Sequence, residues 1–146
     1  MLYFELLSKV PLALKNEDIE KILARASKAF KSQNTEDRVI SIVSVGPREM
    51  RKINLAARNK DEATDVLAFT LQDKDSFVSA PYVNDFFGEI IICPSVAARK
   101  GKARSMSKVQ YQQLLLAHGV LHLFGLDHTK DIDAVKMERL EKKILN

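Results

Sequence analysis

The three histidines of this 146-residue chain all lie within eleven positions, at His118, His122 and His128. His118 and His122 are four residues apart, so on a helix both rings project from one face about one turn apart. Gly125 follows three residues later, where a left-handed residue can end the helix and reverse the chain, bringing His128 round to the other two rings. Three imidazoles that converge with a fourth position open are typical of a catalytic zinc site. The spacing therefore predicts a metal site.

A single histidine is more often a satisfied, half-buried residue than a metal ligand. Here, however, apolar residues flank the histidines throughout residues 114–124, so the helix is expected to be largely buried. Two unpartnered imidazoles in such a setting would cost on the order of 1–3 kcal/mol each in unsatisfied hydrogen bonds. Metal coordination would remove that cost, which favours the metal site over a structural role.

The spacing H-x3-H-x2-G-x2-H is also that of the metzincin proteases, whose signature places Glu directly after the first His. That Glu takes a proton from the zinc-bound water as it attacks a peptide bond. Gly119 occupies the position here and has no side chain for the task. Asp127 is the one carboxylate inside the motif, and it fits a catalytic base, a partner that orients a ligand imidazole, or a turn residue. A base could come from elsewhere in the chain, but the protease hypothesis loses its main support, and a metal-dependent peptidase or other hydrolase is kept as an alternative.

The hydrophobic pattern around this motif predicts a single α+β domain. Residues 38–45 are β-branched and apolar on both faces, as in an interior strand, and Pro47 suits the first turn of a helix. The expected strands are 2–7, 38–45, 65–71 and 88–93, and a loop is expected from 72 to about 85. The expected helices are 16–32, 47–57, 95–103, 107–124 and 131–145. We expect a mixed sheet of about four strands with helices packed on it, and the metal site on a central helix, as in zincin-like folds.

Length and composition agree with one globular domain over residues 1–146, with 46% hydrophobic and 29% charged residues. The single Cys93 excludes an internal disulfide, and we expect it to be a small buried residue rather than a fourth ligand. The longest apolar stretch, 114–124, falls short of the roughly 20 residues that span a bilayer. The first residues have no basic lead-in typical of a signal peptide, so a soluble, cytoplasmic protein is expected.

The net charge of +4 is unevenly distributed. No Asp or Glu occurs in residues 90–126, a segment that carries Arg99, Lys100, Lys102, Arg104 and Lys108. Such a run can follow a nucleic-acid backbone, although a solvated helix and loop would look the same in sequence.

Two motifs together resemble those of the YbeY family, bacterial metal-dependent endoribonucleases of ribosomal RNA maturation. H-G-V-L-H-L-F-G-L-D-H at 118–128 is similar to the family signature H-G-x-L-H-L-x-G-Y-D-H, and residues 53–69 are similar to its N-x-x-Y-R…P-T-D-V-L-S-F. Residues 88–92 resemble its G-[DE]-I-x-I strand, and the last helix resembles its closing helix, with Glu138 and Glu141 among the matches. The sequence departs from the family pattern at Ala57, Ala63, Ala68 and Leu126.

The resemblance implies one Zn²⁺ per chain, held by His118, His122 and His128, and Arg58 as the functional cation. It also implies cleavage of single-stranded RNA, with roles in 16S ribosomal RNA 3′-end maturation and ribosome quality control, and the ribosome or ribosomal proteins as partners, with no membrane. The chemistry agrees, since phosphodiester hydrolysis needs a metal-activated water and a cation for the developing charge. Thr64 and Asp65 are expected to pin the loop beside Arg58. A non-catalytic ribosome assembly factor with a structural zinc is a third hypothesis.

Overall fold

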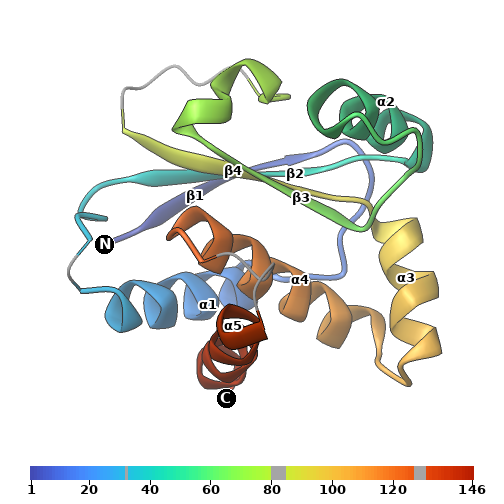
Figure 1. Ribbon diagram of the computed structural model, residues 1–146. Coiled ribbons are helices and arrows are strands. Elements are labelled where there is room, and N and C mark those ends of the chain that lie inside the picture. The colour runs from blue at the N-terminus through green and yellow to red at the C-terminus, as the bar shows by residue number, and fades with distance from the viewer. Residues whose placement is uncertain (32, 80–84, 127–130) are drawn as a thin grey trace.

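One four-stranded mixed sheet forms the centre of the molecule, with helices on both of its faces (Figure 1). This computed structural model describes residues 1–31, 33–79, 85–126 and the helix that begins at Asp131, whose side chains are described from residue 134 on. The strand order is β1 (Tyr3–Ser8), β2 (Val39–Ser44), β4 (Phe86–Ile92) and β3 (Val66–Thr70). β1, β2 and β4 run parallel, and β3 pairs with β4 antiparallel, with Val66 opposite Ile92. The predicted α+β fold with four strands is confirmed.

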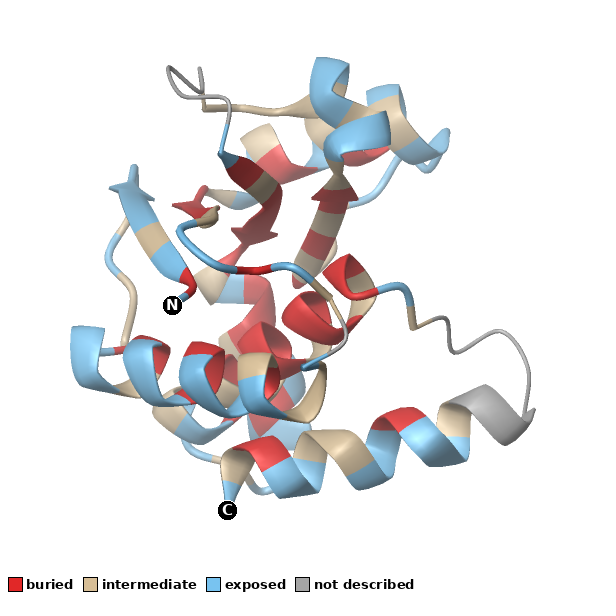
Figure 2. Cartoon of the chain, turned by 90° about the vertical axis from the view of Figure 1, so that its left-hand side faces the viewer, coloured by how far each residue is buried: buried red, intermediate tan, exposed pale blue. Residues whose placement is uncertain are grey.

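The apolar, β-branched strands are the central ones. β2 and β4 are buried almost from end to end, as expected of strands covered on both faces, whereas the edge strand β1 is mostly exposed. Figure 2 shows buried residues gathered in the sheet and along the faces of the helices that turn toward it.

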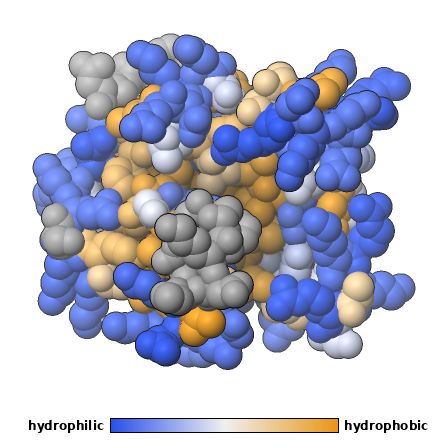
Figure 3. Space-filling view, viewed as in Figure 1, coloured by the Kyte–Doolittle hydropathy of each residue, from blue (hydrophilic) through white to orange (hydrophobic). Residues whose placement is uncertain are grey.

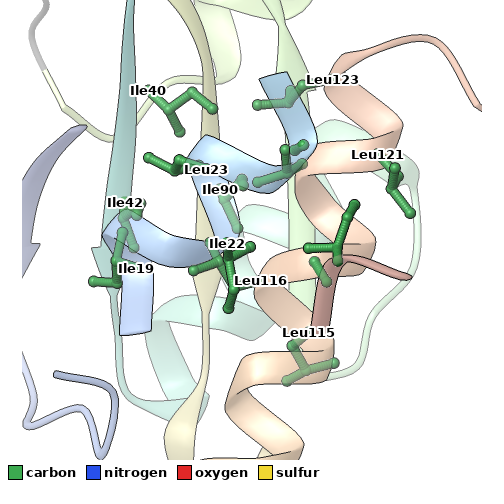
Figure 4. Close-up of a cluster of buried hydrophobic side chains, with 14 of the residues drawn as sticks. Ile19, Ile22, Leu23, Ile40, Ile42, Ile90, Leu115, Leu116, Leu121 and Leu123 are labelled. Atoms are coloured by element: carbon green, nitrogen blue, oxygen red, sulfur yellow. The ribbon is translucent and has the colours of Figure 1, made fainter. Parts of the chain in front are cut away.

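On one face of the sheet lie α1 (Asn16–Ala29) and α4 (Lys108–Leu123), and α5 (Asp131–Leu145) packs on these two helices on the side away from the strands (Figure 1). Their apolar side chains meet those of β2 and β4 in the larger core, which includes Ile19, Leu23, Ile42, Ile90 and Leu116 (Figure 4). On the other face, α2 (Pro47–Arg58) and the 3-10 turn η1 (Leu71–Ser76) cover a smaller core that contains Met50, Phe69 and Ile91. The central strands, apolar on both faces, are thus covered by helices on both sides of one sheet.

α4 is the central helix, as expected, and it packs closely against β4. Its first turn is fixed by Ser107, whose hydroxyl accepts from the Gln110 N–H at 3.1 Å while the Gln110 side chain accepts from the Ser107 N–H at 3.0 Å. A Cβ on Gly119 would lie 3.1 Å from the Ile90 side chain, and a Cβ on Gly88 would lie 2.6 Å from Leu123. Glycine on each of the two elements therefore permits the close approach.

α3 (Pro94–Ala103) packs against α4 and leads into it through residues 104–107. Cys93 precedes α3 and is fully buried, as predicted for a small apolar residue. No described helix is both long and apolar enough to span a membrane.

The expectation of a loop over residues 72–85 was wrong at its start, whereas Asp85 precedes the next strand as expected. Residues 71–76 form η1, because the Asp73 carboxylate accepts from the Thr70 N–H at 3.1 Å and from its hydroxyl at 3.2 Å and so closes a tight turn. β4 begins at Phe86 rather than residue 88, and Phe86 is buried opposite Val39. The first helix is also shorter than expected, since α1 ends at Ala29 rather than residue 32.

Candidate active site

A cavity of about 720 Å³ opens between the end of α2, the strand β3 and the second half of α4. Its walls carry polar and charged groups from three separate parts of the sequence: Asn54, Arg58, Lys60 and Glu62 from α2 and the loop after it, Thr64 and Asp65 before β3, and His118 and His122 on α4. Figure 3 shows the face of the molecule seen in Figure 1, where hydrophobic side chains gather at the middle and hydrophilic ones surround them. The cavity brings together the two motifs that the sequence singled out.

His118 and His122 lie side by side on α4, as their spacing predicts. Their ring centroids are 4.8 Å apart with the planes at 76°, and both side chains are half-buried at the cavity wall. Gly125 follows with φ of +97°, the left-handed conformation predicted for the end of this helix. The predicted third ligand His128 and the carboxylate Asp127 lie outside the described residues.

Glu141 on α5 holds the ring of His118, with its Oε1 atom 2.7 Å from Nδ1. An ionised carboxylate can only accept a hydrogen bond, so this contact favours the tautomer that carries the proton on Nδ1 and leaves the lone pair on Nε2. This is the usual arrangement of an imidazole that ligates a metal. Glu141 was not predicted as a site residue, because it stands 23 positions after His118 and no local spacing links the two.

The described part of the site fits a metal, although it does not complete a metal centre. Two imidazoles on one helix face, one of them oriented by a carboxylate, supply nitrogen ligands that zinc accepts. Among the described residues, no group of three or more His, Cys, Asp or Glu side chains is placed to hold an ion. The agreement with a metal site therefore rests on His118 and His122. The third ligand, His128, stays a prediction from the sequence.

Arg58 is the last residue of α2 and lies at the wall of the same cavity. Its Nη2 donates to the Ala68 carbonyl at 3.1 Å, and its guanidinium carbon is 5.0 Å from the centre of the Phe69 ring. Asn59 takes the left-handed conformation directly after it and ends the helix there. The exposed guanidinium is thus held over β3 from one side, with further N–H groups available for a ligand in the cavity.

Asp65 pins the start of β3, the role expected for it and Thr64. Its carboxylate is nearly buried and accepts from the Tyr111 hydroxyl at 2.8 Å and from the Thr64 hydroxyl at 3.3 Å, and Lys100 lies 3.5 Å away. Burial, and then the hydrogen bond to Asp65, raise the pKa of Tyr111 to about 12. The carboxylate therefore ties β3 to α3 and α4 directly beside the cavity.

The position at which metzincins carry their catalytic Glu is packed against the sheet in this fold. Gly119 lines the cavity, but a Cβ there would meet three side-chain atoms of the buried Ile90 at 3.1 to 3.3 Å. A carboxylate side chain would have to displace that contact. The described carboxylates at the cavity wall are instead Glu62 and Asp65, which lie in the segment between α2 and β3.

Comparison with known proteins agrees with this geometry. A family model described as Endoribonuclease YbeY matches residues 7–146. The chain belongs to the YbeY family. A YbeY protein described as Endoribonuclease YbeY in Staphylococcus carnosus is 32% identical over 130 residues, covering 89% of this chain and 84% of that protein. Its counterpart in Thermodesulfovibrio yellowstonii is 40% identical over 111 residues, covering 74% of this chain and 65% of that relative.

A solved structure shares the fold of this YbeY chain. The solution structure of a protein from Thermotoga maritima superimposes with a TM-score of 0.57 at 22% sequence identity, covering 99% of this chain and 87% of that one. At this identity the likeness concerns the arrangement of helices and strands alone. It supports the sheet order and the placing of the helices described above.

Proposed function

We propose that this chain is a metal-dependent endoribonuclease that cleaves single-stranded RNA, and that residues 1–146 form its one catalytic domain. The observation that carries the proposal is the shared cavity, in which the guanidinium of Arg58 and the imidazoles of His118 and His122 line one space. Membership of a family described as Endoribonuclease YbeY supports the choice of RNA as substrate. The two halves of the site supply the two requirements of phosphodiester hydrolysis, a metal site and a cation for the phosphate.

In this proposal His118, His122 and His128 hold one metal ion. Zinc suits three imidazoles, which also accept nickel, iron or manganese. When bound, the ion supplies Lewis-acid activation of water. The protein orients the first ligand through Glu141, and Asp127 is the proposed catalytic carboxylate of the motif.

Arg58 acts in this proposal on the phosphate. Its fork of N–H groups can bind two phosphate oxygens at once and stabilise the negative charge that develops on them in the transition state. The Ala68 carbonyl and the Phe69 ring fix the guanidinium before substrate arrives, which lowers the cost of ordering it. The cation at the end of α2 and the imidazoles on α4 line one cavity of about 720 Å³, in which we place the phosphate of the substrate.

Basic residues on and after α3 support binding of an extended RNA strand. Arg99, Lys100, Lys102, Arg104 and Lys108 are all exposed, and within the described part of the chain Lys100 alone among them forms an ion pair, with Asp65. Asp65 lines the cavity, so this basic surface begins at the site itself. Each phosphate that it neutralises would release counterions and favour binding.

The family further suggests the biological substrate. We propose 16S ribosomal RNA near its 3′ end as the target, the ribosome or ribosomal proteins as partners, and the cytoplasm as the location. Ribosome quality control would follow from the same cleavage activity.

A peptidase is the principal alternative, and the packing of Gly119 against Ile90 weighs against it. The experiment incubates zinc-loaded protein with single-stranded RNA and, separately, with an unfolded peptide, using wild type and His122→Ala. We expect RNA cleavage that the substitution abolishes, and an intact peptide. Peptide cleavage with intact RNA would establish the peptidase, and a bound metal with neither substrate cleaved would establish the non-catalytic assembly factor.

A further inference from the structure

Glu141 meets His118 from a helix that is docked independently of this contact. Met137 and Ile144 of α5 are buried in the larger core, and the Ile144 carbonyl accepts from Arg25 of α1 at 2.9 Å. These contacts flank Glu141 on both sides along α5. Its carboxylate, 14% exposed, is therefore held where the ring of His118 meets it at 2.7 Å.

The same helix carries a second glutamate, whose described ion pair is with a lysine of α5 itself. Glu138 lies one turn before Glu141, is 68% exposed, and forms its described ion pair with Lys142 at 3.4 Å. The two glutamates have the same chemistry and similar positions along α5. They differ in exposure, and in the part of the chain that the structure describes the hydrogen bond to His118 comes from Glu141.

We propose that Glu141 is a positioning residue of the metal centre, which fixes the ring and the tautomer of His118 so that Nε2 is presented as the ligand atom. The inference rests on the proposed metal site and adds to it a residue from a fifth helix, far from the histidine motif in sequence. A carboxylate on the second nitrogen also makes the imidazole a stronger electron donor to a metal. α5 thereby becomes a structural part of the site rather than a terminal helix that only covers the core.

The test measures metal affinity without any substrate, by competition of the protein with a chromophoric chelator for Zn²⁺. We expect Glu141→Ala to bind zinc about 10- to 100-fold more weakly than wild type, as for other partners of metal-ligating histidines. Glu141→Gln keeps an oxygen that can accept from Nδ1 but loses the charge, so we expect an intermediate affinity. Glu138→Ala and Glu138→Gln, which remove a charge from the same helix, are expected to keep the wild-type affinity within about twofold.

A second readout follows the tautomer directly. Nitrogen NMR of the metal-free protein is expected to place the His118 proton on Nδ1 in wild type and to give a mixture of tautomers in Glu141→Ala. Equal zinc affinity in the Glu141 and Glu138 variants would overturn the inference, and so would a proton on Nε2 in wild type. The Gln variants preserve side-chain size and guard against an effect of misfolding.

Failure of this inference is separate from failure of the proposed function. If wild type cleaves RNA but Glu141→Ala binds zinc normally, the function stands and the positioning role is overturned. If wild type binds zinc with the expected dependence on Glu141 but cleaves no RNA, the positioning role stands and the nuclease proposal is overturned.

Discussion

Arg58 and His118 line the same cavity, and each is held by groups that take no part in the proposed reaction. The Ala68 carbonyl and the Phe69 ring hold the guanidinium, and Glu141 holds His118. Both are therefore positioned before a substrate enters, a condition under which a fixed cation stabilises a transition state effectively. In the proposed reaction, a bound phosphate would lie between two groups that are already in position, the guanidinium of Arg58 and the metal held by the imidazoles.

Arg58→Ala is expected to lower kcat/KM for single-stranded RNA by about 100-fold or more, because one charge-stabilising donor to the transition state is lost. Arg58→Lys should recover only part of this, since an ammonium cannot bind two oxygens in a fixed fork. The measurement uses a quenched fluorescent RNA. Arg51→Ala is the control on the same helix, because Arg51 binds the exposed Asp61 at 2.7 Å and does not line the cavity. Equal losses in the two variants would contradict the role of Arg58.

Tyr111→Phe tests the contact that ties α4 to the start of β3. The lost hydrogen bond to the buried carboxylate of Asp65 should cost about 1.5–3 kcal/mol of unfolding free energy at neutral pH. Burial and the Asp65 contact raise the pKa of Tyr111 to about 12, above its value of 10.0 in the unfolded chain. The stabilisation is therefore fully present below about pH 10 and is lost as the pH rises toward 12.

Urea unfolding at about pH 8 and about pH 11 measures this effect. We expect the stability difference between wild type and Tyr111→Phe to shrink at the higher pH, by up to roughly 2–3 kcal/mol over the full range of titration. Tyr3→Phe is the control, since Tyr3 is 48% exposed on the edge strand. A difference that stays constant with pH would show that the hydroxyl of Tyr111 does not titrate as proposed.

At the scale of elements, the sequence predicts best what local pattern determines. The β-branched run at 38–45 became β2, and the paired histidines with Gly125 correctly indicated a helix that ends in a left-handed residue. η1 was missed because its turn depends on hydrogen bonds between Thr70 and Asp73 that compete with an extended loop. Glu141 was missed because its contact depends on how α5 docks, which no local spacing encodes.

The packing of α4 on β4 carries the histidines to the cavity, and Gly88→Ala tests it. A Cβ at this position would lie 2.6 Å from Leu123 and 2.8 Å from the Phe69 carbonyl, so the helix end or the β3 backbone must shift. We expect a loss of about 1–3 kcal/mol in unfolding free energy by thermal or urea denaturation. Gly46→Ala, with no atom within 4 Å of the added Cβ, should cost less than about 1 kcal/mol. Similar costs at the two glycines would contradict the close packing.

At the scale of the whole molecule, the basic residues along and after α3 mark the surface proposed to bind RNA. Residues 90–126 contain five basic and no acidic residues, and the basic ones are exposed along and after α3. α1 also carries exposed lysines, Lys21 and Lys28, but α1 and α3 lie on opposite sides of α4 (Figure 1). Long-range attraction alone would treat both groups alike, whereas direct phosphate contacts would involve α3 only.

Salt dependence of RNA binding distinguishes these two cases. Neutralising Arg99 and Lys102 together, as Arg99→Ala/Lys102→Ala, should make the plot of log affinity against log salt shallower by about 1.4, because each phosphate contact to a single strand contributes about 0.7 to the slope. Fluorescence anisotropy of a labelled single-stranded RNA, with metal-free protein to prevent cleavage, gives the affinities. Lys21→Ala/Lys28→Ala changes the net charge equally and should leave the slope unchanged. An equal change of slope in both double variants would assign the binding to overall charge, and no change in either would place the RNA elsewhere.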